Sequence, residues 1–188
     1  MLISLSIIMN NCDLSKQVSD DELKNIGLTN IIKYGDLVRY NNILDLLPDV
    51  GSYVIILIES KYNRGHWTCL IRKSKNMIYY FDSYGKGVDG ELEFIAPDER
   101  QRLGESEKLL TNLILRLPRS IRVVSNHVDY QKDSPEVSTC GRHVIFFLMT
   151  ILKHGLTMDQ YHELINTGMR KTGLDSDRLI CLLTNKYL

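Results

Sequence analysis

The sequence SYVIILIESKYNRGHWTCLIRKSKNMIYYFD, residues 52–82, contains three short runs that are rich in β-branched and aromatic residues. The runs cover 52–59, 66–73 and 77–82, and the polar residues Ser74–Asn76 separate the last two. Runs of this length and composition are typical of buried strands, and a short polar break between two of them is typical of a hairpin turn. This part of the chain therefore predicts a three-stranded antiparallel meander.

A second apolar segment follows at residues 140–153, which read CGRHVIFFLMTILK. It is apolar on nearly every side, as in a helix that is buried at the centre of a domain. Gly155 lies just beyond it and suits the left-handed conformation in which helices commonly end. These residues predict a buried central helix.

Further elements are expected on both sides of these segments. Ser19 and Glu22 have the spacing of a capping box, so a helix is expected to begin after Ser19. Pro48 and Pro118 each follow an apolar segment and end it, since proline cannot continue a helix. The remaining predicted elements are helices over 20–27, 40–47, 105–117, 158–166 and 176–187, and a strand over 121–125.

The composition argues against a nucleic-acid-binding or membrane-spanning protein. The chain has 188 residues, with 23 Lys and Arg against 23 Asp and Glu, so its formal net charge is zero. Proteins whose main function is to bind the phosphate backbone of nucleic acids carry an excess of basic residues instead. The longest apolar run, residues 144–152, is far shorter than the roughly 20 residues that cross a bilayer.

The chain shows no repeat, low-complexity tract or flexible linker, so a single domain over residues 1–188 is expected. Within it we expect an N-terminal arm over 1–18, a core over about 50–155 and C-terminal helices over 156–188. Residues 1–10 (MLISLSIIMN) are apolar but lack the basic start and the cleavage pattern of a signal peptide. They are interpreted as a strand or arm that packs on the body.

Cys140 has the most informative position among four widely spaced cysteines, which are Cys12, Cys69, Cys140 and Cys181. Four are too few for a secreted disulfide scaffold of this length, so a reducing compartment is expected. Cys140 stands where a polar loop meets the predicted central helix, and free N–H groups there would lower its pKa below the usual value of about 8.5. A free cysteine is more commonly a small buried hydrophobic residue, so position alone favours a structural role.

A nucleophilic thiolate needs a base and a group that orients the base. His66 opens the second predicted strand, and Asp82 ends the third. If Lys73 opposes Met77 across the turn, the numbers of facing residues sum to about 150, which puts His66 and Asp82 at the same end of the hairpin. The alternative is a structural aspartate that begins the turn DSYG beside a surface histidine, and for the hairpin alone it is the simpler interpretation.

Two further interpretations concern the same residues. His66, Cys69, Cys140 and His143 have a spacing that could bind zinc, but residues three apart on a strand point to opposite faces, so zinc is the weaker interpretation. Gln131 lies in the loop before Cys140, and its amide could donate to an oxyanion. A structural loop glutamine is the default alternative. The other histidines, including His143, are interpreted as structural or surface residues.

Four segments carry a resemblance to a known group of enzymes. GHWTCL (65–70), YFDSYG (80–85), YQ (130–131) and STCGRHV (138–144) resemble, in this order, the motifs of the cysteine proteases grouped with adenain and the SUMO proteases. The last segment is most similar to maturation proteases of large DNA viruses, Mavirus-type virophages and Polinton-like elements. The resemblance implies an α+β, adenain-like fold, in which the central helix carries the nucleophile and packs on a mixed or antiparallel sheet with flanking helices.

The same resemblance implies roles for individual residues. His66 would be the general base, Asp82 its orienting acid, and Cys140 the nucleophile. The oxyanion hole would comprise the backbone N–H of Cys140 and the side chain of Gln131. Gln131 lies nine residues before Cys140, a longer spacing than relatives commonly have. The residues expected to bind substrate are Gly65, Trp67 and Gly141, although Trp67 could equally fill the core.

The implied activity is that of a cysteine endopeptidase that cleaves viral capsid precursors after glycine during particle maturation. A ubiquitin-like-protein deconjugating protease is the first alternative, and a non-catalytic binding module or zinc-stabilised protein is the second. No metal or cofactor is expected. We expect a monomer that acts on protein substrates in the virion or in a cytoplasmic virus factory. DNA and an activating peptide regulate adenain, but the zero net charge gives DNA no support here.

Overall fold

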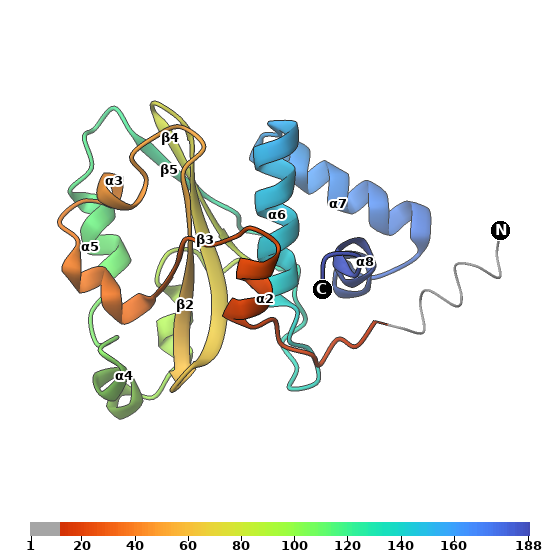
Figure 1. Cartoon of the computed structure of the whole chain (residues 1–188), viewed down its shortest axis with the longest axis horizontal. Helices are drawn as coiled ribbons and strands as arrows, with labels where there is room; N and C mark the ends of the chain where they lie inside the picture. The colour runs from red at the N-terminus through yellow and green to blue at the C-terminus, as the bar shows by residue number, and fades with distance from the viewer. Residues whose placement is uncertain (1–11) are drawn as a thin grey trace.

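A mixed five-stranded sheet separates two layers of helices (Figure 1). The computed structural model describes residues 12–188, so the arm or strand expected over residues 1–10 lies outside the described residues. The strands lie in the sheet in the same order as in the chain. They are β1 (Ile31–Lys33), β2 (Tyr53–Lys61), β3 (Arg64–Ser74), β4 (Met77–Asp82) and β5 (Arg122–Ser125).

The three central strands form the predicted meander. β2 pairs with β3, and β3 pairs with β4, both in antiparallel orientation. The third predicted strand, residues 77–82, is confirmed at both ends. The edge strands β1 and β5 pair parallel to β2 and β4, which makes the sheet mixed. β1 was not predicted, because a strand of three residues is too short to show an alternating pattern.

The central helix α6 (Cys140–His154) covers one face of the sheet. Its apolar side chains form one buried cluster with Trp67, Cys69 and Ile71 of β3. Gly155 ends the helix in the left-handed conformation, as predicted. The same layer holds α2 (Asp20–Asn25), α7 (Met158–Thr172) and α8 (Ser176–Thr184) (Figure 1). The predicted α+β fold, with a central helix on a mixed sheet and flanking helices, is confirmed.

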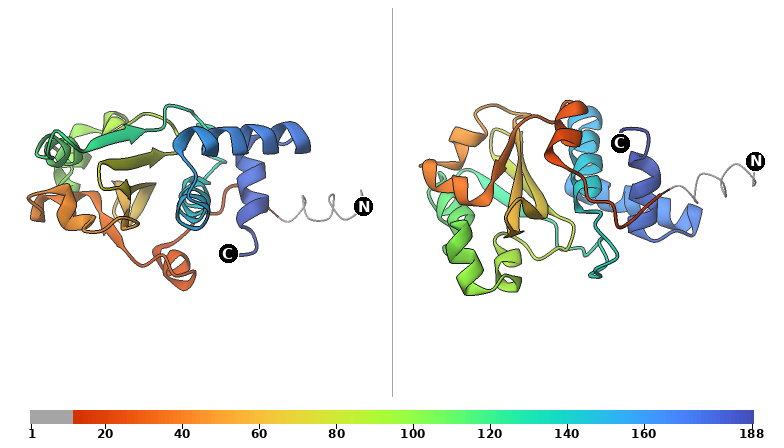
Figure 2. Two further views of the ribbon diagram at one scale, coloured as in Figure 1. Left: turned by 90° about the horizontal axis from the view of Figure 1, so that it is seen from above. Right: turned by 60° about the horizontal axis from the view of Figure 1, so that its bottom comes forward.

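Short helical segments cover the opposite face around a second buried cluster. In both views of Figure 2 these orange and green segments stay on the other side of the strands from the blue C-terminal helices. The segments are η1 (Tyr34–Arg39), α3 (Ile43–Leu46), η2 (Gly90–Phe94), α4 (Pro97–Leu103) and α5 (Leu109–Leu115).

The helix predicted over residues 40–47 is shorter than expected. Only α3 is helical in this range, because the side chain of Asn42 accepts the N–H of Leu44 at 2.9 Å and caps the helix start. Tyr40 lies outside α3 and is the C-cap of the preceding 3-10 helix η1. The sequence pattern therefore placed the apolar residues correctly but not the helix boundary.

The helix predicted over residues 105–117 begins only at Leu109. Glu105 is fully buried and its carboxylate accepts the backbone N–H of Glu59 on β2 at 2.9 Å, which holds the chain in a non-helical turn before α5. The helix α4, which precedes this turn, was not predicted. Both differences arise from contacts with the sheet that a local pattern does not contain.

The C-terminal helices were predicted with their starts close to those observed. α7 continues past the predicted end at 166 to Thr172, where Gly173 takes the left-handed conformation. α8 begins at Ser176 as predicted and ends at Thr184, before the expected 187. These two helices pack with α6 on the same side of the sheet (Figures 1 and 2).

Residues 12–18 run from α8 toward the start of α6. Cys12 forms a disulfide with Cys181 of α8, across a sequence separation of 169 residues. The carbonyl oxygen of Leu14 accepts the N–H of Ser138 at 2.7 Å. This disulfide differs from the sequence-based interpretation, which took the four scattered cysteines as a sign of a reducing compartment. Spacing along the chain does not show which distant cysteines lie close together.

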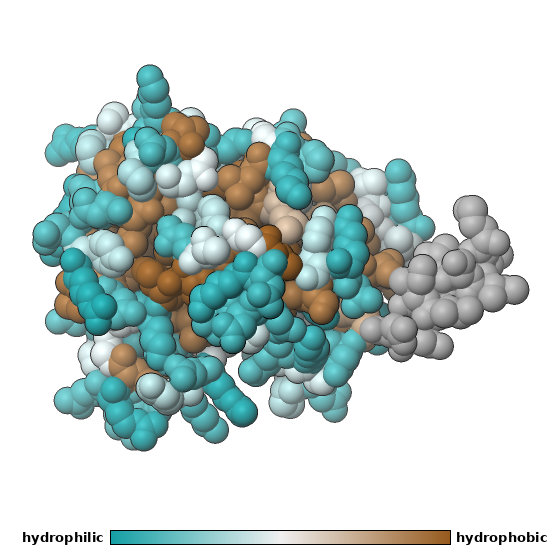
Figure 3. Space-filling model, in the orientation of Figure 1, coloured by the Kyte–Doolittle hydropathy of each residue, from teal (hydrophilic) through white to brown (hydrophobic). Residues whose placement is uncertain are grey.

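The surface in Figure 3 is largely polar, and hydrophobic residues come to the surface in several places between the polar ones. Among residues 12–188, none of the helices combines the length and the hydrophobicity that crossing a membrane requires.

Candidate active site

The pair of His66 and Asp82 lies at one end of the β3–β4 hairpin. In the ladder Asp82 faces Thr68, so His66, two residues earlier on the same strand, lies on the same face at a diagonal position. The imidazole Nε2 of His66 lies 2.7 Å from Oδ1 of Asp82, and both side chains are almost completely buried. Strand pairing alone thus brings the two side chains together.

The register of this hairpin differs from the predicted one near the turn. Ser74 faces Met77, where Lys73 was expected, because the ladder contains a β-bulge at this point. Past the bulge, pairs such as Thr68 and Asp82 follow the predicted sum of 150. The error is therefore confined to the turn and does not reach the His66 end.

Asp82 is fully buried and held by several backbone groups. Oδ1 accepts the N–H of Tyr84 and Oδ2 accepts the N–H of Lys86, each at 3.0 Å. The backbone of Asp82 also exchanges two hydrogen bonds with the side chain of Asn126, at 2.9 and 2.7 Å. These contacts fix the carboxylate so that it faces the imidazole of His66.

Cys140 is the first residue of α6 and is 8% exposed. Burial alone raises the pKa of its thiol, but a hydrogen bond and the charge of His66 lower it, together with the backbone N–H groups of Trp67 and Gly141. The net result is a thiol pKa below the ordinary value. The structure therefore favours a thiolate at this position.

The imidazole of His66 responds in the complementary direction. Burial alone lowers its pKa, but hydrogen bonds to Asp82 and Cys140 and the charges of both groups raise it to about 10. Because Nε2 faces Asp82, Nδ1 is the ring nitrogen available to the thiol of Cys140. The hydrogen bond and the opposite charges of the two groups therefore favour a thiolate–imidazolium pair over the neutral pair.

Gln131 lies in the loop before α6 and is 2% exposed. Its Oε1 accepts the hydroxyl of Ser83 at 2.8 Å, and its Nε2 donates to the hydroxyl of Tyr84 at 3.0 Å. A second contact from Nε2, to the carbonyl of Val137, is long at 3.4 Å. The amide is thus oriented by its oxygen, and one of its N–H groups is only weakly engaged.

A single cleft of about 740 Å³ is lined by His66, Gln131 and Cys140. Val18 and β1 contribute to its lining, and so do Tyr84 and η2. His66 is 9% exposed and Cys140 is 8% exposed, so both reactive side chains are nearly buried in the wall of the cleft.

The three residues expected to bind substrate have different surroundings. Trp67 lines the cleft, and its indole N–H donates to the carbonyl of Val18 at 2.8 Å. Gly65 also lines the cleft, and a Cβ on it would lie 1.8 Å from the carbonyl oxygen of Ile58. A Cβ on Gly141 would lie 2.6 Å from the side chain of Val18. Close packing therefore accounts for both glycines, and their contact with substrate stays a prediction.

Two cleft residues were not identified from the sequence. The ring of Tyr84 stacks on the imidazole of His66, with centroids 4.7 Å apart, and its hydroxyl binds Gln131. Its signal was present in the DSYG motif. Glu91 of η2 has a carboxylate within 4.8 Å of ligand atoms of His66 and Asp82, and burial raises its pKa to about 7. No local pattern marks Glu91.

The four candidate zinc ligands, His66, Cys69, Cys140 and His143, do not form a cluster that could hold a metal ion. Among residues 12–188, the only group of three or more clustered metal-ligating side chains is His66, Asp82 and Glu91. Cys69 is fully buried in the cluster between β3 and α6, and burial raises the pKa of its thiol. His143, interpreted from the sequence as a structural or surface residue, is fully buried and faces Asp177 at 3.2 Å.

Comparisons with known proteins find a sequence relative and a structural neighbour of this chain. No protein-family model matches it. It is 30% identical to the uncharacterized protein V9 of the Sputnik virophage over an alignment of 154 residues. This alignment covers 82% of this chain and 85% of V9. The crystal structure of the selenomethionine-labelled ASFV pS273R protease aligns with 92% of this chain and 68% of that chain, with a TM-score of 0.45 and 11% identity. A structural likeness this distant assigns no activity.

Proposed function

This chain belongs to the same family as protein V9 of the Sputnik virophage, and from the chemistry of its cleft we propose that it is a cysteine endopeptidase. The observation that carries the proposal is the arrangement of Asp82, His66 and Cys140. The carboxylate orients the imidazole at 2.7 Å, and the imidazole lowers the pKa of the thiol. A base, an orienting group and an activated nucleophile are the components that nucleophilic catalysis requires.

The proposed reaction is acyl transfer through the thiolate of Cys140. The sulfur attacks a backbone carbonyl carbon, and the resulting oxyanion accepts hydrogen bonds from the N–H of Cys140 and from Nε2 of Gln131. The imidazolium of His66 then protonates the leaving amine, and the C–N bond breaks. In the second half, His66 takes a proton from water, the hydroxide attacks the thioester, and the thiolate leaves as the acid product forms.

The proposed substrates are viral capsid precursors that are cut after glycine during particle maturation. The burial of Cys140 supports this, because a residue without a side chain lets the substrate backbone come closest to a nearly buried sulfur. The kinship with a virophage protein supports a viral setting. The enzyme would act as a monomer, in the virion or in a virus factory of the host cytoplasm, and nothing in its charge points to DNA activation.

A second candidate function is the deconjugation of ubiquitin-like proteins. The same catalytic residues serve both reactions, and both substrates present glycine before the scissile bond, so the two differ only in the substrate that the cleft accepts. Incubating the purified protein with a viral capsid precursor and with a ubiquitin-like precursor separates them. Processing of the capsid precursor alone supports the first proposal, and processing of the ubiquitin-like precursor alone replaces it with the second.

The test of the enzyme class is labelling by a thiol-directed, glycine-ended vinyl probe. We expect native protein to form an adduct at Cys140 and the folded variants Cys140→Ala and His66→Ala to form none. Cys69→Ser is the matched control, because it removes a buried thiol that lacks an imidazole partner and should leave labelling unchanged. Equal labelling of native protein and His66→Ala would favour the non-catalytic binding module instead.

A further inference from the structure

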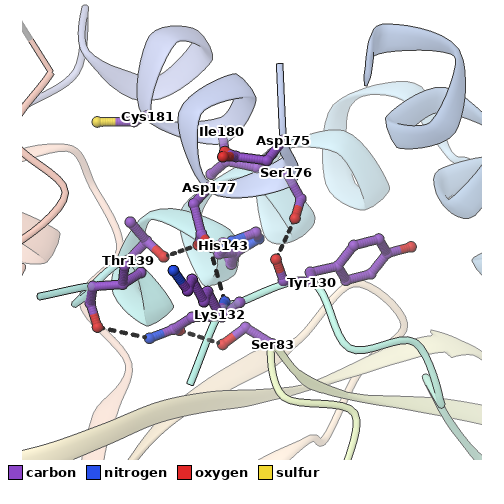
Figure 4. Close-up of polar contacts among 12 residues, drawn as sticks. Ser83, Tyr130, Lys132, Thr139, His143, Asp175, Ser176, Asp177, Ile180 and Cys181 are labelled. Carbon is purple, nitrogen blue, oxygen red and sulfur yellow. Dashed lines mark hydrogen bonds and ion pairs between the residues drawn. The ribbon is translucent and has the colours of Figure 1, made fainter. Parts of the chain in front are cut away.

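The first turn of α8 holds the loop that carries Gln131 (Figure 4). Ser176 donates a hydrogen bond from Oγ to the carbonyl oxygen of Tyr130. The Oδ2 atom of Asp177 accepts the backbone N–H of Lys132 at 2.9 Å. The residues on both sides of Gln131 are therefore bonded to consecutive residues of α8.

The second carboxylate oxygen of Asp177 faces α6 (Figure 4). Oδ1 accepts the hydroxyl of Thr139, the residue directly before Cys140, and lies 3.2 Å from Nε2 of His143, one turn into the helix. Asp177 is 4% exposed, and Thr139 and His143 are fully buried. A single buried carboxylate therefore connects the Gln131 loop with the end of the helix that presents Cys140.

The hydrogen bonds to Asp177 keep it charged in this buried place. Burial alone raises its pKa, but the donors from His143, Thr139 and the N–H of Lys132 lower it below the ordinary value. Each of these donors would be left unpaired and buried without the carboxylate, which is unfavourable. The junction therefore has one preferred geometry and resists small displacements.

We propose that Asp177, assisted by Ser176, is a positioning residue that sets the place of the oxyanion donor Gln131 relative to the nucleophile Cys140. The inference rests on the proposed cysteine protease function. Asp177 lies outside the lining of the cleft and acts through the loop and the helix end. The catalytic reaction described above does not use it.

The orientation of His66 does not depend on this junction. His66 is oriented by Asp82 and stacks on Tyr84, and both of these belong to the β4 end of the sheet. Loss of Asp177 would leave the Gln131 loop bonded through the carbonyl of Ser83, which accepts the N–H groups of residues 130 and 131 at 2.8 and 3.0 Å. The oxyanion step should therefore suffer, while simple alkylation of the thiol should not.

The experiment uses the full chain with the variants Asp177→Ala and Ser176→Ala. The matched control is Asp175→Ala, which removes the cap on the N–H of Arg178 at 2.8 Å in the same turn of α8 but leaves the loop contacts intact. Three quantities are measured for each variant: kcat and KM on a fluorogenic peptide with Gly-Gly before the reporter, affinity for a glycine-ended peptide aldehyde, and the pH profile of Cys140 alkylation by iodoacetamide. The aldehyde forms a tetrahedral adduct whose oxyanion occupies the hole, whereas iodoacetamide needs no hole.

For Asp177→Ala we expect kcat and aldehyde affinity to fall by up to about 10²-fold, the lower end of the range seen when an oxyanion donor is removed, with KM and the alkylation profile unchanged. Ser176→Ala should show the same pattern more weakly, and it carries the test if Asp177→Ala does not fold. Asp175→Ala should keep both kcat and aldehyde affinity.

Equal losses in Asp175→Ala and Ser176→Ala, or a parallel loss of alkylation, would show a purely structural role and overturn the inference. If native protein alkylates at Cys140 but neither cleaves peptide nor binds aldehyde, the proposed function itself fails, and the positioning role fails with it. Active native protein with an equally active, folded Asp177→Ala overturns the positioning role alone.

Discussion

The two sides of the cleft are held in place by different means. His66 and Asp82 lie 16 residues apart on paired strands, and the hairpin itself brings them together. Cys140 begins α6, and Gln131 lies in the loop before it. Asp177 of α8 binds residues next to both, which are Lys132 beside Gln131 and Thr139 beside Cys140. The base side is thus a local structure, whereas the nucleophile side requires the C-terminal part of the chain to be folded onto it.

This difference separates two kinds of failure. Changes on the sheet side should alter the ionisation of the thiol, because they act on its charged partner. Changes on the helix side should alter positioning or global stability and leave the ionisation in place. Three substitutions and the reduction of the disulfide test this separation.

His66→Ala should have the largest effect. In native protein the imidazolium lowers the pKa of Cys140, so the thiolate forms at a lower pH than an ordinary thiolate does. Without the imidazolium, burial raises the pKa of Cys140, and the thiolate forms only at a more alkaline pH. Peptide cleavage should fall by at least about 10⁴-fold. Initial cleavage rates and the pH midpoint of alkylation measure both effects.

The control for this prediction is His127→Ala, which removes an exposed loop histidine and should change neither quantity. An alkylation midpoint that stays in place in folded His66→Ala would contradict the proposed ion pair, whatever happens to cleavage.

Reduction of the disulfide between Cys12 and Cys181 tests the helix side. The link restricts the unfolded chain across 169 residues, so its loss should lower the free energy of unfolding by about 2–5 kcal/mol. Urea denaturation with and without reductant measures the change. The double variant Cys12→Ser with Cys181→Ser should have the same free energy of unfolding as the reduced protein. Adding reductant should not change its denaturation curve. Coincident curves for native protein under both conditions would refute the stabilisation.

Tyr84→Phe tests the contact where the two sides meet. The ring that stacks on His66 is kept, but the hydroxyl that accepts the Gln131 amide is lost. We expect kcat to fall by about fivefold to tenfold, the worth of one hydrogen bond of roughly 1 kcal/mol, with an unchanged alkylation midpoint. Steady-state kinetics against Tyr62→Phe, an exposed tyrosine, check this. A shifted midpoint would place Tyr84 with the ionising pair instead.

Glu91→Gln should have the smallest effect. Burial raises the pKa of Glu91 to about 7, so below that pH the carboxyl is neutral and above it the negative charge favours the imidazolium of His66. Because the pKa of His66 is already about 10, the change in cleavage rate should be only about twofold to threefold. Native protein should show a shallow inflection near pH 7 that the variant lacks. Superimposable pH–rate curves would argue against this coupling.

Some features of the candidate site could be anticipated from short stretches of sequence. The hairpin register follows from two adjacent runs and one turn, so the proximity of His66 and Asp82 could be anticipated. The predicted register was wrong only at the β-bulge beside the turn. Cys140 could be placed at a helix start because the polar loop and the apolar helix are contiguous. The orientation of Gln131 could not, since Ser83 and Tyr84, which bind its side chain, are 48 and 47 residues away.

The meander, the buried central helix and the capping box of Ser19 and Glu22 follow from local sequence, because strand alternation, helical periodicity and caps are each set by residues within a few positions of one another. Long-range packing sets the parallel edge strands, the disulfide, the burial of Glu91 beside His66 and the contacts of Asp177 with the loop and helix beside Cys140. These features depend on which distant segments share a face of the sheet. That choice is made by the packing of the two layers as a whole, and no local pattern encodes it.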